Sequence, residues 1–305
     1  MGNKILIGVD FGGTKILTGA MTEEGKVIAE AVNVPTGGND ARDKILERLN
    51  HSIEEVLRRS KADIGDVRGI GLGVTGPLDI TNGVILECPQ LPTLQFFPLK
   101  KTVEERFNCP VFMNNDANCL IYSEALFGAG RGKRNVVGFT LGTGLGCAII
   151  LDGKIFAGST ESAGEVWPSP YGNGTIEDLV SGAGVSKIYK RISGKDGSSL
   201  EIAKLAEGGD ADALATWGEF GEHLAVAVSW VINLIDPEIV ILGGSISNAF
   251  KLFSPSMEEN IRKHICPVPA QKTKIACAKL GANAGVIGAA ALIIEGEKKL
   301  TPIVS

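Results

Sequence analysis

Two glycine-rich segments, far apart in the chain, contain residue types that could bind phosphate. The first follows the apolar run Ile5–Val9, and the second follows Val136–Phe139. Each places a threonine among glycines directly after a predicted strand, so that backbone N–H groups and a hydroxyl can converge on phosphate oxygens. Two such turns, with a carboxylate candidate between them, predict a duplicated nucleotide clamp. The residues concerned are Asp10, Gly12, Gly13, Thr14 and Lys15 in the first segment, and Gly142, Thr143, Gly144 and Gly146 in the second.

The carboxylate between the two turns is Asp116, which stands where a predicted strand, 110–113, gives way to a predicted helix, 117–127. There it could take the proton of an attacking hydroxyl, as phosphoryl transfer requires, or simply cap the helix. Asp10 is the candidate to hold Mg²⁺ through water, the alternative being a turn aspartate that accepts local N–H groups. Lys15 either neutralises phosphate charge or is a solvated lysine.

The elements that position these residues alternate between strands and helices, which indicates an α/β architecture. The order strand, glycine turn, strand, hairpin, strand recurs after about 130 residues and indicates two related domains. We expect an N-terminal domain over 1–117, with a C-terminal helix over about 285–305 packing back on it, and a second domain over 118–284. Ligands of such sheets bind at strand ends, so we expect a nucleotide in a cleft between the domains.

The local pattern gives the elements in more detail. Alternation of apolar residues predicts strands, and apolar positions three or four residues apart predict helices. Predicted strands are Ile5–Asp10, Ile16–Met21, Val27–Val34, Gly69–Val74, Val136–Thr140, Cys147–Leu151, Lys154–Phe156 and Ile239–Leu242; predicted helices include 40–60, Thr102–Phe107, Ala117–Phe127 and several between Glu177 and Ile235.

The bulk composition excludes several classes of protein. The chain has 305 residues, of which 44% are hydrophobic and 21% charged, and its net charge is −5. These values support sizeable cores and disfavour disorder or nucleic-acid binding. The apolar runs are too short and interrupted to cross a bilayer. Six cysteines without paired spacing, and an N-terminus that enters a strand at once, favour reduced thiols in the cytoplasm.

Several motifs, in order along nearly the whole chain, resemble the ROK family of sugar kinases and sugar-sensing repressors. They are the segments Asp10–Lys15, Asn115–Asn118, Gly142–Gly146, Gly164-Glu165 and Leu242–Ile246. The resemblance implies the duplicated actin-like (ribonuclease H-like) ATPase fold. It also implies transfer of the γ-phosphate of ATP, with Mg²⁺, to a hydroxyl of a hexose or N-acetylhexosamine.

The resemblance also implies roles for single residues. Asp116 matches the catalytic base, and the first and second glycine segments match phosphate elements. The remaining matches are Gly76, Pro77, Asn115, Glu165 and Glu177 for the sugar, together with Asp116, and Gly243, Gly244 and Ser245 for the adenosine part of ATP. From the residues alone, Glu177 could instead be a charge in the first turn of its own helix.

The chain departs from the zinc-bearing members of that family. Those members have a histidine shortly after the Gly-Glu pair and then a cluster of cysteines. Here Pro168 replaces the histidine, and the segment Pro170–Glu177 has no cysteine. Because zinc sites are built from Cys and His ligands, we expect no zinc. Gln90 stands where the family more often has an asparagine.

We therefore expect an ATP-dependent sugar kinase that favours glucose. Fructose, N-acetylmannosamine and N-acetylglucosamine are the alternative substrates. A sugar-sensing transcriptional regulator is disfavoured, since only nine residues precede Asp10 and leave no room for a helix-turn-helix. A catalytically inactive sugar-binding module is disfavoured because both phosphate turns and Asp116 are retained. We expect a homodimer or homotetramer with a small-molecule sugar as partner, and neither nucleic acid nor membrane.

Overall fold

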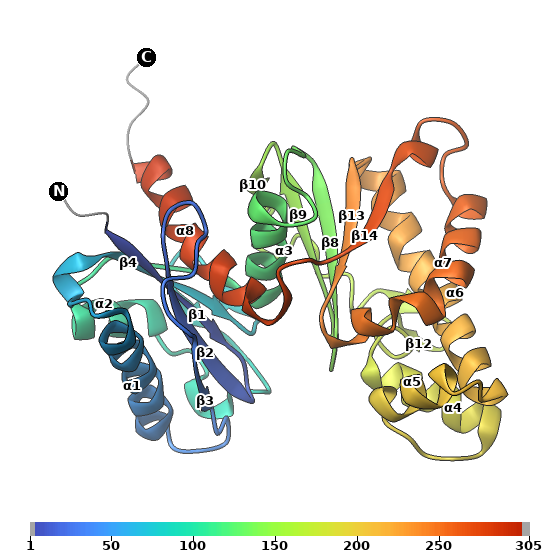
Figure 1. Ribbon diagram of the computed structural model, residues 1–305, viewed down its shortest axis with the longest axis horizontal. Coiled ribbons are helices and arrows are strands. Elements are labelled where there is room, and N and C mark those ends of the chain that lie inside the picture. The colour runs from blue at the N-terminus through green and yellow to red at the C-terminus, as the bar shows by residue number, and fades with distance from the viewer. Residues whose placement is uncertain (1–3, 301–305) are drawn as a thin grey trace. The chain divides into compact units, whose positions relative to one another are not determined.

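The computed structural model describes the backbone of residues 4–300 and the side chains up to residue 296. The described chain forms two compact units. The first contains the residues up to Phe127, the short segment Gly158–Glu161 and the residues from Leu280 onward, and the second contains Gly128–Ala157 and Ser162–Lys279. Each unit has its own five-stranded sheet with helices (Figure 1). The expected α/β class is confirmed.

The first unit is built on a mixed sheet of strand order β3-β2-β1-β4-β7. Strands β1, β4 and β7 run parallel, β2 pairs antiparallel with β1, and β3 pairs antiparallel with β2. Phe11 pairs with Val74, which pairs in turn with Asn115, so the carboxyl ends of the three parallel strands share one edge. The elements are β1 (Ile5–Phe11), β2 (Lys15–Met21), β3 (Val32–Pro35), α1 (Arg42–Ser60), β4 (Val67–Val74), β5 (Leu78–Asp79), β6 (Val84–Ile85), α2 (Leu99–Phe107), β7 (Val111–Asn115), α3 (Asp116–Phe127) and α8 (Ala284–Leu300).

Helices cover both faces of this sheet. Successive residues of β1 point to opposite sides, and apolar residues lie on both sides, so each face is buried by a helix. Ile7 and Val9 pack into the core that contains the apolar residues of α1, whereas Leu6 packs with the apolar residues of α8. The backbone of α8 lies close to the backbone of the strands: a β-carbon on Gly8 or Gly71 would collide with the α8 backbone. Glycine in a strand interior marks such a close approach of another backbone. The alanine-rich last helix therefore lies directly on the strands.

Helix α3 belongs to the first unit because it packs on α8. A β-carbon on Gly288 would collide with the backbone of Cys119, and the buried Glu124 carboxylate accepts a hydrogen bond of 2.7 Å from the Leu280 N–H. The compact units consequently divide the chain after Phe127, whereas we expected a domain boundary after residue 117. The end of the expected helix, 301–305, lies outside the described residues.

The second unit repeats the arrangement of the first. Its sheet has the order β10-β9-β8-β13-β14: β8, β13 and β14 run parallel, β9 pairs antiparallel with β8, and β10 pairs antiparallel with β9. The internal repeat inferred from the sequence therefore corresponds to two sheets of the same strand pattern. The elements are β8 (Val136–Leu141), β9 (Leu145–Leu151), β10 (Lys154–Ile155), β11 (Pro170–Tyr171), β12 (Gly174–Thr175), α4 (Gly182–Ser193), α5 (Ser199–Glu207), α6 (Ala211–Ile235), β13 (Ile239–Gly243), α7 (Phe250–His264) and β14 (Lys274–Cys277).

A large aromatic core holds the helices of the second unit together. Trp217 and Phe220 of α6 pack against Phe253 of α7, with ring centroids 5.4–6.1 Å apart. Aromatic pairs at such distances add to the stabilisation that burial alone provides. Of the helices within residues 4–300, none combines the length and apolar character needed to cross a bilayer.

One predicted strand is wrong over most of its length. We expected Val27–Val34, but β3 begins only at Val32, and Val27 forms a single bridge with Met21. The turn at Glu24-Gly25 is as expected, since the Thr22 N–H donates to the Lys26 carbonyl. The residues between Val27 and Val32 lie outside the ladder with β2. The alternation of apolar residues in this segment therefore does not correspond to a continuous strand.

Candidate functional site

The first glycine turn links β1 to β2 and is fixed by a threonine that follows β3. The Gly12 N–H donates to the Lys15 carbonyl at 3.0 Å. The buried Thr36 hydroxyl donates to the Gly12 carbonyl at 2.6 Å, and the Thr36 N–H donates to the Thr14 carbonyl at 2.9 Å. Thr14 and Lys15 themselves are exposed. Thr36 therefore fixes the backbone of the turn, while the side chains of Thr14 and Lys15 are exposed to solvent.

Asp10 lies one residue before the end of β1, between its partners Leu17 on β2 and Gly73 on β4. Its carboxylate abuts the first turn of α8, where a β-carbon on Gly285 would be 2.9 Å from the carboxyl carbon. Burial raises the pKa of Asp10 above its ordinary value, and the charge of Lys15 partly opposes this rise. A half-buried carboxylate of this kind is stabilised when a cation approaches it.

Asn115 and Asp116 stand at the junction between β7 and α3. The Ala117 N–H donates to Oδ1 of Asp116 at 2.7 Å and to Oδ1 of Asn115 at 2.9 Å. A β-carbon on Gly76, which follows the neighbouring strand β4, would be 3.1 Å from the Asn115 side-chain nitrogen. The structure therefore brings Gly76, Asn115 and Asp116 together, with the exposed Pro77 next in the chain.

A buried thiol lies within reach of the charges of both predicted carboxylates of the first unit. Cys119 is fully buried on α3, and burial raises the pKa of its thiol well above the ordinary value. The negative charges of Asp116, Asp10 and Glu295 raise this pKa further. Asp10 and Asp116 therefore share one end of the first sheet, as its parallel strand ends require.

The second glycine turn links β8 to β9 and lies against the strand-to-helix turn after β13. Gly243 of β13 pairs with Thr140 of β8, and Thr140 pairs on its other side with Gly146 of β9. Gly244 has φ +84°, and a β-carbon there would collide with the backbone of Leu141. Only glycine combines this left-handed conformation with so close an approach. Ser245 Oγ would lie 3.9 Å from a β-carbon on Gly142.

Glu177 contacts the second glycine turn directly. The Leu145 N–H donates to Oε2 of Glu177 at 2.8 Å. A β-carbon on Gly144 would be 2.6 Å from the same oxygen. The carboxylate that we expected to bind sugar thus holds the backbone of the predicted phosphate turn.

Glu165 lies in a different environment. It is exposed, and its Oε2 accepts a hydrogen bond of 2.6 Å from the Trp167 indole N–H. Its neighbour Gly164, at φ +91°, packs on the backbone of Cys147 in β9. Burial, with a contribution from the Glu165 charge, raises the pKa of Cys147 to about 12. Glu165 is therefore anchored at β9, and Trp167 orients its carboxylate.

A small hairpin of β11 and β12 occupies the segment where zinc-bearing ROK proteins have cysteines. Tyr171 Oη and His223 Nδ1 on α6 are 3.0 Å apart, and the Tyr171 ring meets Trp230 edge-on at 6.4 Å. Among the described residues, no group of three or more His, Cys, Asp or Glu side chains could hold a metal ion. Hydrogen bonds and aromatic contacts hold this hairpin on α6.

Sequence reasoning missed three residues that shape the turns. Thr36 fixes the first turn, and Gly285 gives room to Asp10. Gly182, at the start of α4, donates its N–H to the Gly142 carbonyl at 2.8 Å. Ser181-Gly182 before an amphipathic helix is a recognisable helix start, because Ser181 accepts from the Gly184 N–H. No comparable signal marks Thr36 or Gly285.

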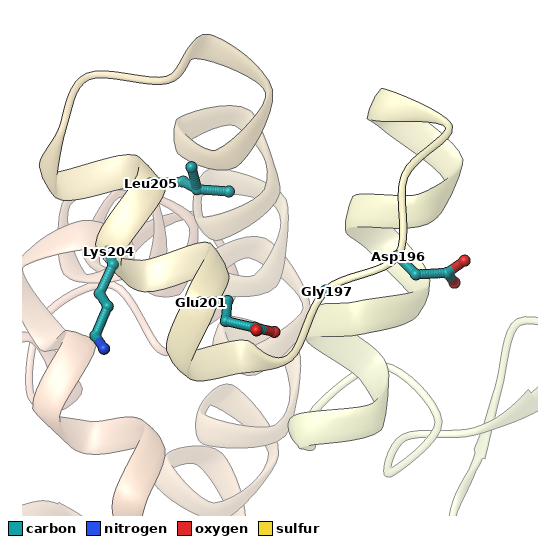
Figure 2. Close-up of a pocket in the computed structure, with 5 residues that line it drawn as sticks. All are labelled: Asp196, Gly197, Glu201, Lys204 and Leu205. Atoms are coloured by element: carbon teal, nitrogen blue, oxygen red, sulfur yellow. The ribbon is translucent and has the colours of Figure 1, made fainter.

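A surface pocket of about 450 Å³ lies elsewhere in the second unit, between the end of α4 and α5 (Figure 2). Its acidic groups already have local partners: Asp196 pairs with Lys190, and Glu201 accepts from Ser198 in a capping box. No predicted site residue lines it; the lining residues are Asp196, Gly197, Glu201, Lys204 and Leu205. We therefore do not assign the pocket to the site.

Solved structures of ROK sugar kinases have the same fold over nearly the whole chain. The ROK hexokinase of Thermus thermophilus superposes with a TM-score of 0.83 at 28% identity, covering 97% of this chain and 99% of that one. A ROK glucokinase of Streptomyces griseus, solved with glucose and AMPPNP, gives a TM-score of 0.82 at 27% identity, covering 96% and 100%. The expected actin-like ATPase fold is confirmed.

Sequence comparison gives the same result. An N-acetyl-D-glucosamine kinase of Photobacterium profundum is 33% identical over 94% of this chain and 99% of that protein. A glucokinase of Thermotoga maritima is 30% identical over 95% and 97%. The model of the ROK family matches residues 6–296, which is nearly the whole chain. The chain therefore belongs to the ROK family, as its motifs indicated.

Proposed function

We propose that this protein is an ATP-dependent sugar kinase that transfers the γ-phosphate to a hydroxyl of a hexose, with glucose as the favoured acceptor. The observation that best supports the proposal is the position of Asp116. Its carboxylate lies at the shared edge where β1, β4 and β7 end, beside Asn115 and Gly76. Relatives of the chain include a glucokinase and an N-acetyl-D-glucosamine kinase.

Asp116 acts as the base that accepts the proton of the attacking sugar hydroxyl. Such a positioned base contributes about 10²–10⁴-fold to the rate. Its hydrogen bond from Ala117 fixes the carboxylate without protonating it, because the donor is a backbone N–H. Phosphoryl transfer needs alignment and charge neutralisation more than covalent chemistry, so this one oriented carboxylate is the base that the acceptor side requires.

Each glycine turn contributes contacts to the ATP phosphates through its threonine hydroxyl and through the N–H groups that the turn does not use itself; the Gly12 and Gly142 N–H groups donate within their own turns. Thr14 and Thr143 are exposed at the tips of these turns. Gly243, Gly244 and Ser245 contact the adenosine part, since the glycines allow the backbone to approach a ligand closely. Lys15 neutralises phosphate charge. Gly12, Gly13, Gly142, Gly144 and Gly146 complete the turns.

The sugar contacts are assigned to the residues that match the sugar-binding motifs of the family. Asn115, with Gly76 and Pro77, lines the sugar site in the first unit, and Glu165 and Glu177 accept hydrogen bonds from the sugar hydroxyls. Ionised carboxylates make stronger hydrogen bonds to hydroxyl donors than neutral acceptors do. The Trp167 contact leaves the carboxylate of Glu165 exposed, and an exposed carboxylate can accept a ligand hydroxyl.

Asp10 fits the Mg²⁺ that nucleotide-dependent transfer requires. Its half-buried carboxylate has a raised pKa caused by burial, so a nearby cation would favour its ionised form. Magnesium retains most of its water and usually takes one or two carboxylates together with phosphates. When bound, Mg²⁺ neutralises the charge that develops on the phosphates. We place the protein in the cytoplasm, where ATP and reduced cysteines occur together, as a homodimer or homotetramer.

A coupled ADP-release assay over hexoses and N-acetylhexosamines tests the proposal. We expect sugar-dependent ADP formation, fastest with glucose. N-Acetylglucosamine is the second candidate, since relatives with that activity are as similar as the glucokinase. A preference for the N-acetylated sugar would replace glucose in the proposal. Absence of ADP release with every sugar would refute kinase activity.

A further inference from the structure

Glu177 has a structural position that its proposed contact with sugar does not explain. Its Oε2 accepts the N–H of Leu145 at 2.8 Å, at the point where the second glycine turn enters β9. Within the part of the chain that the structure describes, the Glu177 side chain makes no other hydrogen bond. A hydrogen bond from an amide to an ionised carboxylate is about twice as strong as one between neutral groups.

The backbone that bears Glu177 is fixed on both sides. Ile176 is fully buried in the core of the second unit, and its N–H donates to the Ser169 carbonyl at 3.0 Å. The Val180 N–H donates back to the Ile176 carbonyl at 2.9 Å. The preceding hairpin is held on α6 by Tyr171 and His223. Glu177 therefore extends from a rigid base toward the turn.

Across residues 4–296, chain neighbours aside, the Glu177 carboxylate is the one group close to the position where a side chain at residue 144 would begin. The nearest atoms to a β-carbon on Gly144 are Oε2 and Cδ of Glu177, at 2.6 and 3.5 Å, and no third atom lies within 4 Å. Gly144 does not have a positive φ that would require glycine. The absence of a side chain at position 144 is thus explained, within this structure, by the position of Glu177.

We propose that Glu177 is a positioning residue for the nucleotide-binding turn: it holds Leu145 and so fixes the N–H groups of residues 143 and 144 in the arrangement that receives phosphate, while the Gly142 N–H donates within the turn to the Gly144 carbonyl. The inference rests on the proposed kinase function and adds to the contact of Glu177 with sugar. The motif resemblance assigns Glu177 to sugar binding, whereas its hydrogen bond from Leu145 connects it to the nucleotide-binding turn. Loss of its carboxylate should therefore weaken nucleotide binding even when no sugar is present.

The experiment measures the affinity of the full chain for AMPPNP with Mg²⁺, by calorimetry and without sugar. We expect Glu177→Ala to weaken AMPPNP binding by roughly tenfold to a hundredfold, the loss of a charged hydrogen bond. Glu177→Gln should lose less, because its amide oxygen still accepts from Leu145. Glu165→Ala is the matched control, a second proposed sugar carboxylate that does not touch the turn, and should keep the AMPPNP affinity while raising the sugar KM.

A second measurement keeps the test independent of ligand contacts. Gly144→Ala places a methyl group where Glu177 Oε2 lies, so it should lower Tm in the wild-type background. In the Glu177→Ala background the same space is open, so the two losses in Tm should not add. Additive losses would show that the two residues do not interact.

The outcomes separate the inference from the function on which it rests. If Glu177→Ala binds AMPPNP as the wild type does and only the sugar KM rises, Glu177 is a sugar ligand alone, and the inference is wrong while the kinase proposal stands. If the wild-type protein itself fails to bind AMPPNP and releases no ADP, the proposed function fails and the inference fails with it.

Discussion

Gly285 leaves the space that the Asp10 carboxylate occupies. A β-carbon at position 285 would be 2.9 Å from both Cγ and Oδ2 of Asp10 and 3.3 Å from its Cβ. Gly285 lies in the first turn of α8, and Asp10 lies near the end of β1. Aspartate is short, so it cannot move its carboxylate aside without a different rotamer. The last helix of the chain therefore determines the orientation of a carboxylate near its beginning.

Gly285→Ala should consequently reduce activity with Mg²⁺ and ATP more than it reduces stability. Alanine favours the helix by about 1 kcal/mol over glycine, which offsets part of the steric cost. We expect a higher KM for Mg-ATP with a Tm close to the wild-type value. Gly218→Ala is the matched control, since Gly218 is a glycine in helix α6 with nothing within 4 Å of an added β-carbon. Equal kinetics for Gly285→Ala and wild type would refute the link to Asp10.

Asp10→Asn should stabilise the protein without ligands at neutral pH. Burial raises the pKa of Asp10 above 3.8, so the folded state binds the proton more tightly than the unfolded state does. The unfolding free energy of the wild type therefore falls as pH rises from about 3.8 through the raised pKa. Asparagine removes this part of the pH dependence. Urea unfolding across that pH range measures it, and a less stable Asn variant at pH 7 would contradict the reasoning.

Asp116→Asn separates catalysis from helix capping. The Asn side-chain oxygen can still accept the Ala117 N–H, but the amide cannot take a proton. We expect kcat to fall by about 10²–10⁴-fold while Tm stays near that of the wild type. Asp116→Ala should lose the same activity and, in addition, about 1 kcal/mol of stability from the missing cap. Near-normal turnover of the Asn variant would eliminate Asp116 as the base.

Metal analysis of the purified chain should find no stoichiometric zinc. The hairpin of β11 and β12 has Pro168 nearby and no cysteine, and the Tyr171 hydroxyl holds it to His223. A chelator should accordingly leave Tm unchanged, since structural zinc contributes to folding where it is present. One zinc per chain, or a large loss of Tm with chelator, would show that other residues supply a metal site.

The strands that lead into glycine turns could be predicted because their sequence leaves few alternatives. Ile5–Val9 and Val136–Phe139 are apolar runs with one internal glycine each, the third residue after each run is the first glycine of a turn, and β1 and β8 include these runs. Such runs fit strands covered on both faces. Val27–Val34 has a similar composition but only its end pairs in the sheet. Local sequence does not specify where a partner strand stops.

The tertiary contacts around the site could not be predicted in the same way. Nothing near Glu177 in the sequence indicates that its carboxylate reaches Leu145, because the contact depends on how the hairpin before it packs on α6. Gly285 likewise looked like an ordinary residue of an alanine-rich helix. Motif resemblance identified Asp116 and Glu177 as candidates, but their hydrogen-bond partners follow from packing.

The position of α8 determines when the first sheet can be completed during synthesis. The segment after Leu280 packs on the face of β1 that includes Leu6 and Gly8, and it is synthesised after every strand of the first sheet. The second unit, by contrast, is finished at Lys279. The nascent chain must therefore keep an apolar face exposed until that segment has been made, and such surfaces are prone to aggregate. A chain that ends before Leu280 would retain that exposed face permanently.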